Sequence, residues 1–188
     1  MTLEVVQVGH PVLRERAREL SLEELAAPET QRLIDDMIET MRARAGAGLA
    51  ANQVGEARRV AVIEVTEGNP RYPYKPPIPL TVIVNPVIEP LDGELFTINE
   101  GCLSVPDLRG DVERYLRVRV EYLDRDGAPS ELVAEGLTAG TFQHEVDHLH
   151  GVLFLDRLVD TRSLATWEQF ARHGEQAFLA RVAPYTRS

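Results

Sequence analysis

Two histidines four residues apart constrain this chain more than any other feature of its sequence. The segment His144-Glu145-Val146-Asp147-His148 places both imidazoles on one face of a helix, one turn above the other. From that face the two rings can hold one metal ion, and Glu145 beside them can accept or return a proton. Catalytic sites of this kind usually have three protein ligands and one open position, so a third ligand is expected elsewhere in the chain.

The sequence offers more than one candidate for the third ligand. The pattern His-Glu-x-x-His-x-x-Gly-x-x-His is excluded, because Phe154 stands where its third histidine would be. A glutamate from a later helix, as in thermolysin-like peptidases, remains open because Glu168 and Glu175 lie downstream. The single cysteine, Cys102, lies upstream in Glu100-Gly101-Cys102-Leu103-Ser104, and a deprotonated thiol is a strong soft ligand. Cysteine with two histidines would leave one position open for chemistry.

Composition and charge narrow the class of protein. The chain has 188 residues, of which 44% are hydrophobic and 27% charged, as expected for one soluble globular domain. Its net charge of -10 disfavours binding to phosphate backbones, so no sequence-specific nucleic acid partner is expected. No apolar run has the length of a membrane helix, and the amino terminus does not resemble a signal peptide. With one cysteine and therefore no internal disulfide, we expect a cytoplasmic protein that does not bind membranes.

Hydrophobic periodicity predicts an α+β domain rather than alternating βαβ units. We expect strands at residues 60–65, 80–85, 94–98, 116–122 and 131–134, and helices at residues 28–45, 138–150 and 163–182. Residues 66–79 carry five prolines and predict a loop. Gly46 and Gly151 are expected to end the two longer helices that precede them, since glycine commonly follows a helix.

A third segment connects the two motifs to a known family. Gly46-Ala47-Gly48-Leu49-Ala50-Ala51-Asn52-Gln53 follows a predicted helix and precedes a predicted strand. With this segment, the cysteine segment and the histidine segment in that order, the chain resembles the peptide deformylases. Their signatures are Gly-x-Gly-Leu-Ala-Ala-x-Gln, Glu-Gly-Cys-x-Ser and Gln-His-Glu-x-x-His. The resemblance runs from about residue 5 to about residue 158, and the helix expected at 163–182 carries no motif.

The resemblance implies a fold and a reaction. The fold would be a single catalytic domain over residues 1–188, with antiparallel sheets packed around the histidine-bearing helix and with an amino-terminal and a carboxyl-terminal helix. The reaction would be metal-dependent hydrolysis of the formyl group from N-formyl-methionine at the start of new polypeptides, releasing formate. It implies the metal ligands Cys102, His144 and His148. It implies that Glu145 transfers the proton, and that Gln53 and the backbone N–H of Leu103 hold the oxyanion.

Further residues are candidates because they match family positions or lie near the motifs. In the family, the segment at Ala47 and Gly48 pairs with the substrate like an added strand. The candidate substrate-binding residues are Ala47, Gly48, Ile98, Arg109, Leu137, Gly140, Thr141 and Phe142. Gly140 stands where a larger apolar residue is common in the family, which predicts a wide pocket for the methionine side chain. Glu100, Gln143 and Asp147 are candidates for supporting the ligands from behind, Asp147 by fixing a histidine tautomer.

The metal and the partners follow from the resemblance rather than from ligand chemistry. Cysteine and histidine ligands accept Zn(II), Fe(II), Co(II) or Ni(II), and the family implies Fe(II) as the working ion. The expected partners are N-formyl-methionyl peptides and the ribosome near its exit tunnel. The amphipathic carboxyl-terminal helix suits ribosome docking, dimerisation or cover for the core.

Two other functions remain compatible with these residues. A metallopeptidase or another amidase would use the same histidines with a downstream glutamate ligand. A non-catalytic metal-binding paralogue would act through a partner. Gln53 and Glu145 argue against that paralogue, because purely structural metal sites need neither residue.

Overall fold

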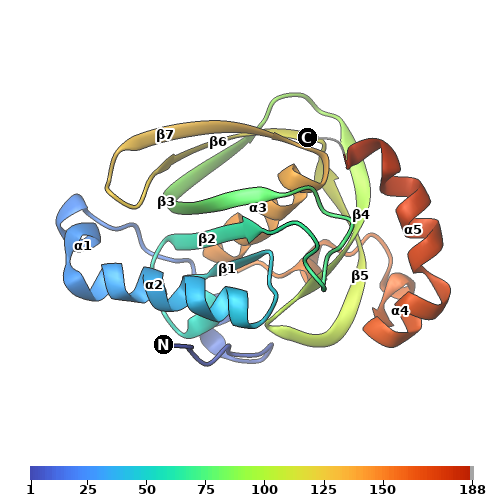
Figure 1. Ribbon diagram of the computed structural model, residues 1–188, viewed down its shortest axis with the longest axis horizontal. Coiled ribbons are helices and arrows are strands. Elements are labelled where there is room, and N and C mark those ends of the chain that lie inside the picture. Colours follow the sequence, from blue (N-terminus) through green and yellow to red (C-terminus); the bar gives the residue numbers. More distant parts are fainter. Residues whose placement is uncertain (187–188) are drawn as a thin grey trace.

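The computed structural model describes residues 1–186 and combines helices with two antiparallel sheets (Figure 1). The five-stranded sheet has the order β1 (Gly48–Ala50), β2 (Val60–Val65), β3 (Ile78–Pro90), β6 (Arg117–Leu123) and β7 (Pro129–Glu135). The three-stranded sheet has the order β4 (Leu95–Cys102), β5 (Val105–Tyr115) and β8 (Ala165–Thr166). Every neighbouring pair described within these sheets is antiparallel, so the predicted mixed fold with antiparallel sheets is confirmed.

Five α-helices accompany the sheets in the described part of the chain. They are α1 (Leu22–Ala26), α2 (Pro28–Ala43), α3 (Gly136–Leu149), α4 (Trp167–His173) and α5 (Glu175–Val182). Helix α3 contacts strands of both sheets, from β1 and β2 on one side to β4 and β5 on the other. Twelve of its fourteen residues are buried, so α3 lies in the core and not on the surface. This placement brings the histidine motif, which α3 carries, between the sheets.

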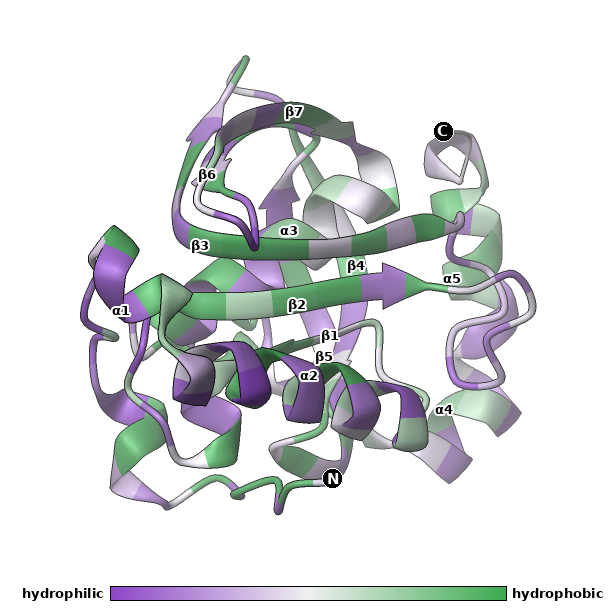
Figure 2. Cartoon of the chain, turned by 60° about the vertical axis from the view of Figure 1, so that its left-hand side comes forward, coloured by the Kyte–Doolittle hydropathy of each residue, from purple (hydrophilic) through white to green (hydrophobic). Residues whose placement is uncertain are grey.

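Helix α2 follows from its amphipathic sequence. Ile34, Met37 and Met41 recur at helical spacing and are fully buried. They belong to the same hydrophobic cluster as Val60 and Val62 of β2, whose ribbon is hydrophobic over most of its length (Figure 2). Burial of this apolar face fixes α2 against the five-stranded sheet.

Predicted boundaries in the first two thirds of the chain differ from the observed ones, and two strands there were missed. The helix expected to end at Gly46 ends at Ala43, and Ala45 takes the left-handed backbone conformation, with φ 49°. The strand predicted to end at Asn85 continues to Pro90 through a bulge in which Asn85 also has φ 49°. The three-residue strand β1 and all of β5 were not predicted.

The predicted carboxyl-terminal helix over residues 163–182 is wrong as one continuous element. Helices α4 and α5 are separate, and they join at Gly174. A Cβ at Gly174 would lie 3.0 Å from the Phe170 ring, so glycine permits the close packing at this break. Phe170, Phe178 and Val182 are buried against the three-stranded sheet. In the described residues 1–186, no helix combines the length and the apolar character that crossing a membrane would require.

Candidate active site

Cys102, His144 and His148 bring their ligand atoms to one point. Cys102 is the last residue of β4, and the two histidines lie one turn apart on α3. The Nε2 atom of His148 lies 3.3 Å from the Cys102 sulfur and 3.3 Å from Nε2 of His144. Ligands of one tetrahedral zinc-type ion would be roughly 3.3 to 3.7 Å apart. Two of the three separations have this spacing, and all three ligand atoms lie within 4.8 Å of one another, so the group could hold one metal ion.

No other group of three or more such side chains occurs in residues 1–186. Glu168 and Glu175, the alternative third ligands, lie on α4 and α5 and do not belong to this group. The structure thus gives the thiol, and not a downstream carboxylate, as the third donor beside the two imidazoles.

A buried ion-pair chain lies behind His144. Its Nδ1 atom is 2.8 Å from Oε2 of Glu100, and Arg114 binds both oxygens of Glu100 at 2.8 Å. Arg114 also binds Asp147, which in turn binds Arg157. A carboxylate on Nδ1 fixes the ring so that Nε2 faces the other donors. Asp147 binds two arginines and not a histidine, so the expected direct contact between Asp147 and a ligand ring is absent.

The two imidazoles have opposite electrostatic environments. Burial would lower the pKa of His144, but the carboxylate of Glu100 and the sulfur of Cys102 raise it well above the usual value. Burial and the neighbouring charge of His144 hold the pKa of His148 well below the usual value. His148 is therefore neutral and has a lone pair available, which is the form that binds a metal.

The Gln53 side chain is oriented towards the cysteine by the backbone N–H of Ala50. Its Oε1 accepts a hydrogen bond of 2.9 Å from the N–H of Ala50, which directs the amide nitrogen to the other side. That nitrogen lies 3.4 Å from the Cys102 sulfur and donates to Oγ of Ser104 at 3.2 Å. Gln53 is buried in the short helix Ala51–Val54, so its position is fixed by the fold. An N–H donor thus faces the donor cluster.

Glu145 is buried beside the donor cluster without a binding partner for one of its oxygens. Its Oε2 atom has no hydrogen bond, and the side chain lies against Gly48 of β1. Burial raises the pKa of Glu145 to about 7, against the opposing effects of His144 and Lys75. A carboxyl group with a pKa near neutrality can both accept and return a proton.

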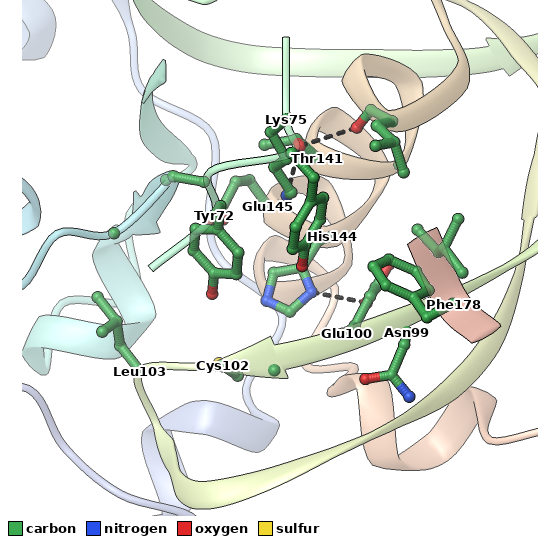
Figure 3. A pocket seen from close by; sticks show the side chains of 18 of the residues that line it. Tyr72, Lys75, Asn99, Glu100, Cys102, Leu103, Thr141, His144, Glu145 and Phe178 are labelled. Carbon is green, nitrogen blue, oxygen red and sulfur yellow. Dashed lines mark hydrogen bonds and ion pairs between the residues drawn. The ribbon is translucent and has the colours of Figure 1, made fainter. Parts of the chain in front are cut away.

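One small cavity of about 40 Å³ lies beside this cluster, and Gln53, Glu100, Cys102, His144 and Glu145 line it (Figure 3). Most of the expected substrate-binding residues line it: Ala47, Gly48, Ile98, Leu137, Gly140 and Thr141. The predicted widening at Gly140 is absent, because a Cβ there would lie 2.6 Å from Cδ1 of Ile98, which fills the space.

Three candidates lie away from this cavity. Phe142 is buried in the core between the sheets. Gln143 binds the backbone of Tyr115, beyond the cluster. Arg109 is buried beneath α4 and α5, with its guanidinium stacked 3.8 Å from the centre of the Phe170 ring and bonded to Asn99 and Tyr74. Its charge is therefore not presented to the cavity.

Five lining residues outside the motifs were missed by the sequence analysis, and one of them, Asn99, directly precedes Glu100 on β4. Tyr72, Tyr74 and Lys75 come from the loop between β2 and β3, and Phe178 comes from α5. Tyr74 and Phe178 meet edge to face, with ring centres 5.0 Å apart. No local pattern marks these contacts, because they form between segments about a hundred residues apart. The single lysine in an arginine-rich chain was the one available signal for Lys75.

A buried set of cysteine and histidine donors, an adjacent carboxylate of raised pKa and a small pocket beside them together characterise a metal-dependent hydrolase. Comparison with known proteins gives the family. Residues 2–163 match the family model described as polypeptide deformylase. The chain is 40% identical to a peptide deformylase of Leptospira biflexa over 84% of this chain and 88% of that protein. It is 44% identical to peptide deformylase 1 of Prochlorococcus marinus over 85% of this chain and 82% of that protein.

Solved structures agree with the sequence comparison. The Met-Ala-Ser-bound class I type b peptide deformylase of Acinetobacter baumannii is 42% identical and superposes with a TM-score of 0.80, over 84% of this chain and 99% of that chain. An actinonin complex of the Synechococcus elongatus peptide deformylase gives a TM-score of 0.75 at 38% identity, over 92% of this chain and 86% of that chain. The chain belongs to the peptide deformylase family. It is a hydrolase that removes the formyl group from the amino terminus of newly made polypeptides.

Proposed function

We propose that Cys102, His144 and His148 hold the catalytic metal ion for deformylation. The observation that supports this proposal is that Nε2 of His148 lies 3.3 Å from both the Cys102 sulfur and Nε2 of His144, with all three ligand atoms within 4.8 Å of one another. When bound, a divalent metal supplies Lewis-acid chemistry, because it acidifies water and polarises the formyl carbonyl. Glu100 would hold His144 in the orientation that this set requires.

Glu145 is the proposed proton carrier. Its carboxylate would accept a proton from the attacking water and deliver it to the nitrogen of the departing amine. Its burial, its raised pKa and the unpaired Oε2 atom support this role. The products would be formate and a free amino-terminal methionine.

Gln53 and the backbone N–H of Leu103 are the proposed donors to the oxyanion. The Ala50 N–H fixes the Gln53 amide so that its nitrogen faces the site before substrate arrives. Donors that are already oriented stabilise developing charge without reorganisation. Leu103 lines the same cavity and directly follows Cys102.

The substrate is proposed to lie along β1, with its backbone beside Ala47 and Gly48 and its first side chain in the cavity. Ile98, Leu137 and Thr141 provide the wall for that side chain. The Acinetobacter relative was solved with bound Met-Ala-Ser, a peptide of the product class, which supports this placement. We do not assign substrate contact to Arg109 or Phe142, since neither lines the cavity.

Fe(II) is the proposed working ion, with Zn(II), Co(II) or Ni(II) able to occupy the same donors. An iron-loaded sample should lose activity in air because thiolate-ligated Fe(II) is readily oxidised, and exchange to Ni(II) should slow that loss. Full stability of the iron-loaded enzyme in air would contradict this assignment.

We propose one catalytic domain over residues 1–188, with α3 as its central helix, acting in the cytoplasm near the ribosome exit tunnel. Phe178 and Val182 of α5 are buried against the sheet, which supports a role for the terminal helices as cover for the site.

The experiment is release of formate from formyl-Met-Ala-Ser by protein purified without oxygen, with metal content measured on the same sample. Loss of release in Glu145→Ala with the metal retained would support the assigned proton transfer. Cleavage of unformylated peptides would instead favour the metallopeptidase alternative. Metal-loaded protein without either activity would favour the non-catalytic paralogue.

A further inference from the structure

Lys75 is the only lysine of this chain, because the other nineteen of its 20 basic residues are arginines. It lies in the loop between β2 and β3, and its partly buried side chain lines the active-site cavity. Lysine ends in a compact ammonium, whereas arginine ends in a broad planar fork. The single lysine of the chain therefore places a compact positive charge at the wall of a small cavity.

The contacts of Lys75 use only part of its bonding capacity. Its Nζ donates a hydrogen bond of 2.8 Å to Oγ1 of Thr141, whose own hydroxyl donates to the carbonyl of Leu137 at 3.0 Å (Figure 3). Nζ also lies 4.8 Å from the centre of the Tyr72 ring. An ammonium has three donors. Thr141 takes one of them, and even if the face of Tyr72 takes another, at least one donor is left for a molecule in the cavity.

The charge of Lys75 has no direct counter-ion. No carboxylate in residues 1–186 pairs with it, and Glu100 and Glu145 act on it only through space. Because Arg109 is held beneath the terminal helices, Lys75 is the only lysine or arginine among the described residues that line the cavity. A neutral hydrogen-bond acceptor suits this position better than a carboxylate, which Glu100 and Glu145 would repel.

The position of Lys75 indicates which part of the substrate it meets. Thr141 belongs to the wall that receives the first side chain, while Leu103 lies at the opposite end of the view in Figure 3. We propose that Lys75 is a specificity-determining residue that donates a hydrogen bond to the first side chain, so that the enzyme deformylates peptides beginning with formyl-methionine sulfoxide. This inference rests on the proposed function of the same site.

Methionine sulfoxide matches the site in shape and in chemistry. It keeps the unbranched chain of methionine and is larger by one oxygen atom, so the two side chains need nearly the same width of pocket. The thioether sulfur is a weak acceptor, whereas oxidation adds a strongly polar oxygen. An apolar wall would reject that oxygen, but the spare donor of Lys75 can bind it.

The first test compares two substrates on nickel-exchanged enzyme: formyl-Met-Ala-Ser and the same peptide with methionine sulfoxide. A hydrogen bond from a charged donor is worth roughly tenfold or more in binding. Lys75→Met should therefore lower kcat/KM for the sulfoxide by about tenfold more than for methionine, because any effect of the lost charge on Glu145 acts on both substrates alike. The matched control is Arg71→Met, which removes a cation from the same loop but outside the cavity and should leave both values unchanged.

Equal losses on both substrates, or no loss on either, would overturn the proposal. A second test does not depend on turnover. Since Lys75 is the only lysine, acetylation of the intact protein modifies this side chain and the amino terminus alone. Met(O)-Ala-Ser should protect Lys75 at concentrations about tenfold lower than Met-Ala-Ser, as measured by mass spectrometry. Equal protection by the two peptides contradicts the role of Lys75, whereas failure of all variants on formyl-Met-Ala-Ser contradicts the proposed function.

Discussion

The carboxylate of Glu145 lies directly against the backbone of Gly48. A Cβ at Gly48 would fall 2.4 Å from Oε1 and 2.6 Å from Cγ of Glu145, distances that real side chains do not adopt. Gly48 begins β1, and Glu145 follows the first histidine of α3, so the contact joins the edge of the five-stranded sheet to the helix. The absence of a side chain at Gly48 therefore determines where Glu145 can stand.

Gly48→Ala should displace Glu145 and lower kcat/KM for formyl-Met-Ala-Ser by about a hundredfold, since a shift of about 1 Å in a catalytic group can cost that much. Metal content should remain near that of the unaltered enzyme. Gly93→Ala is the matched control, because a Cβ there meets nothing within 4 Å. Unchanged activity in Gly48→Ala would show that Glu145 does not need its observed position.

Cys102→Ala should remove the thiol ligand and leave two imidazoles that hold a divalent ion weakly. After dialysis against a chelator, we expect metal content to fall by about tenfold or more relative to the unaltered protein, as measured by atomic emission. His173→Ala removes an exposed histidine outside the donor group and should retain the metal. Retention of the ion by Cys102→Ala would point to a different third ligand.

Arg114→Met should destabilise the fold, because it leaves the buried carboxylates of Glu100 and Asp147 without their shared cation. Breaking a buried ion pair from one side typically costs about 3–5 kcal/mol. The free energy of unfolding in urea measures this loss. Arg117→Met, which removes two exposed and long ion pairs, should cost less than about 1 kcal/mol. Similar losses in the two variants would contradict a structural role for the buried chain.

The preference for the sulfoxide substrate should depend on pH through Lys75. Burial lowers the pKa of Lys75 to about 8, and Arg109 and Arg114 add to this effect while Glu100 and Glu145 oppose it. The charged form is present below that pKa and is lost above it, so the sulfoxide-to-methionine ratio of kcat/KM should fall as the pH rises through about 8. Other ionisations affect both substrates and cancel in this ratio. If this ratio fell equally steeply with pH in the Lys75→Met variant, Lys75 would be excluded as the cause.

The sequence predicted the segments whose chemistry or periodicity is local. The helix expected at 138–150 is observed at Gly136–Leu149, because two histidines at helical spacing and a continuous apolar pattern both require it. Strand β5 was missed because Pro106, Asp107 and Gly110 interrupt any alternating pattern. Its structure comes from the long antiparallel pairing with β4, which local propensity does not reveal.

In the site, too, residues in local motifs were predictable and residues placed by tertiary packing were not. Cys102, His144 and His148 were recognisable because each carries ligand chemistry within a short motif, and the structure brings them together. The burial of Arg109 under Trp167 and Phe170 was not predictable, since it depends on how α4 and α5 fold back on the sheet. The lining residues Lys75 and Phe178 come from a loop and a terminal helix whose positions are determined only by tertiary packing.

The separation of the donors along the chain has a consequence for the lifetime of the protein. Cys102 and His148 are 46 residues apart, and a bound ion would link the end of β4 to α3 much as a disulfide would. An ion that binds only the folded state adds about 4 kcal/mol of stability when its free concentration is a thousand times the Kd. We therefore expect the cell's metal supply to determine not only how fast each molecule works but also how long it escapes proteolysis.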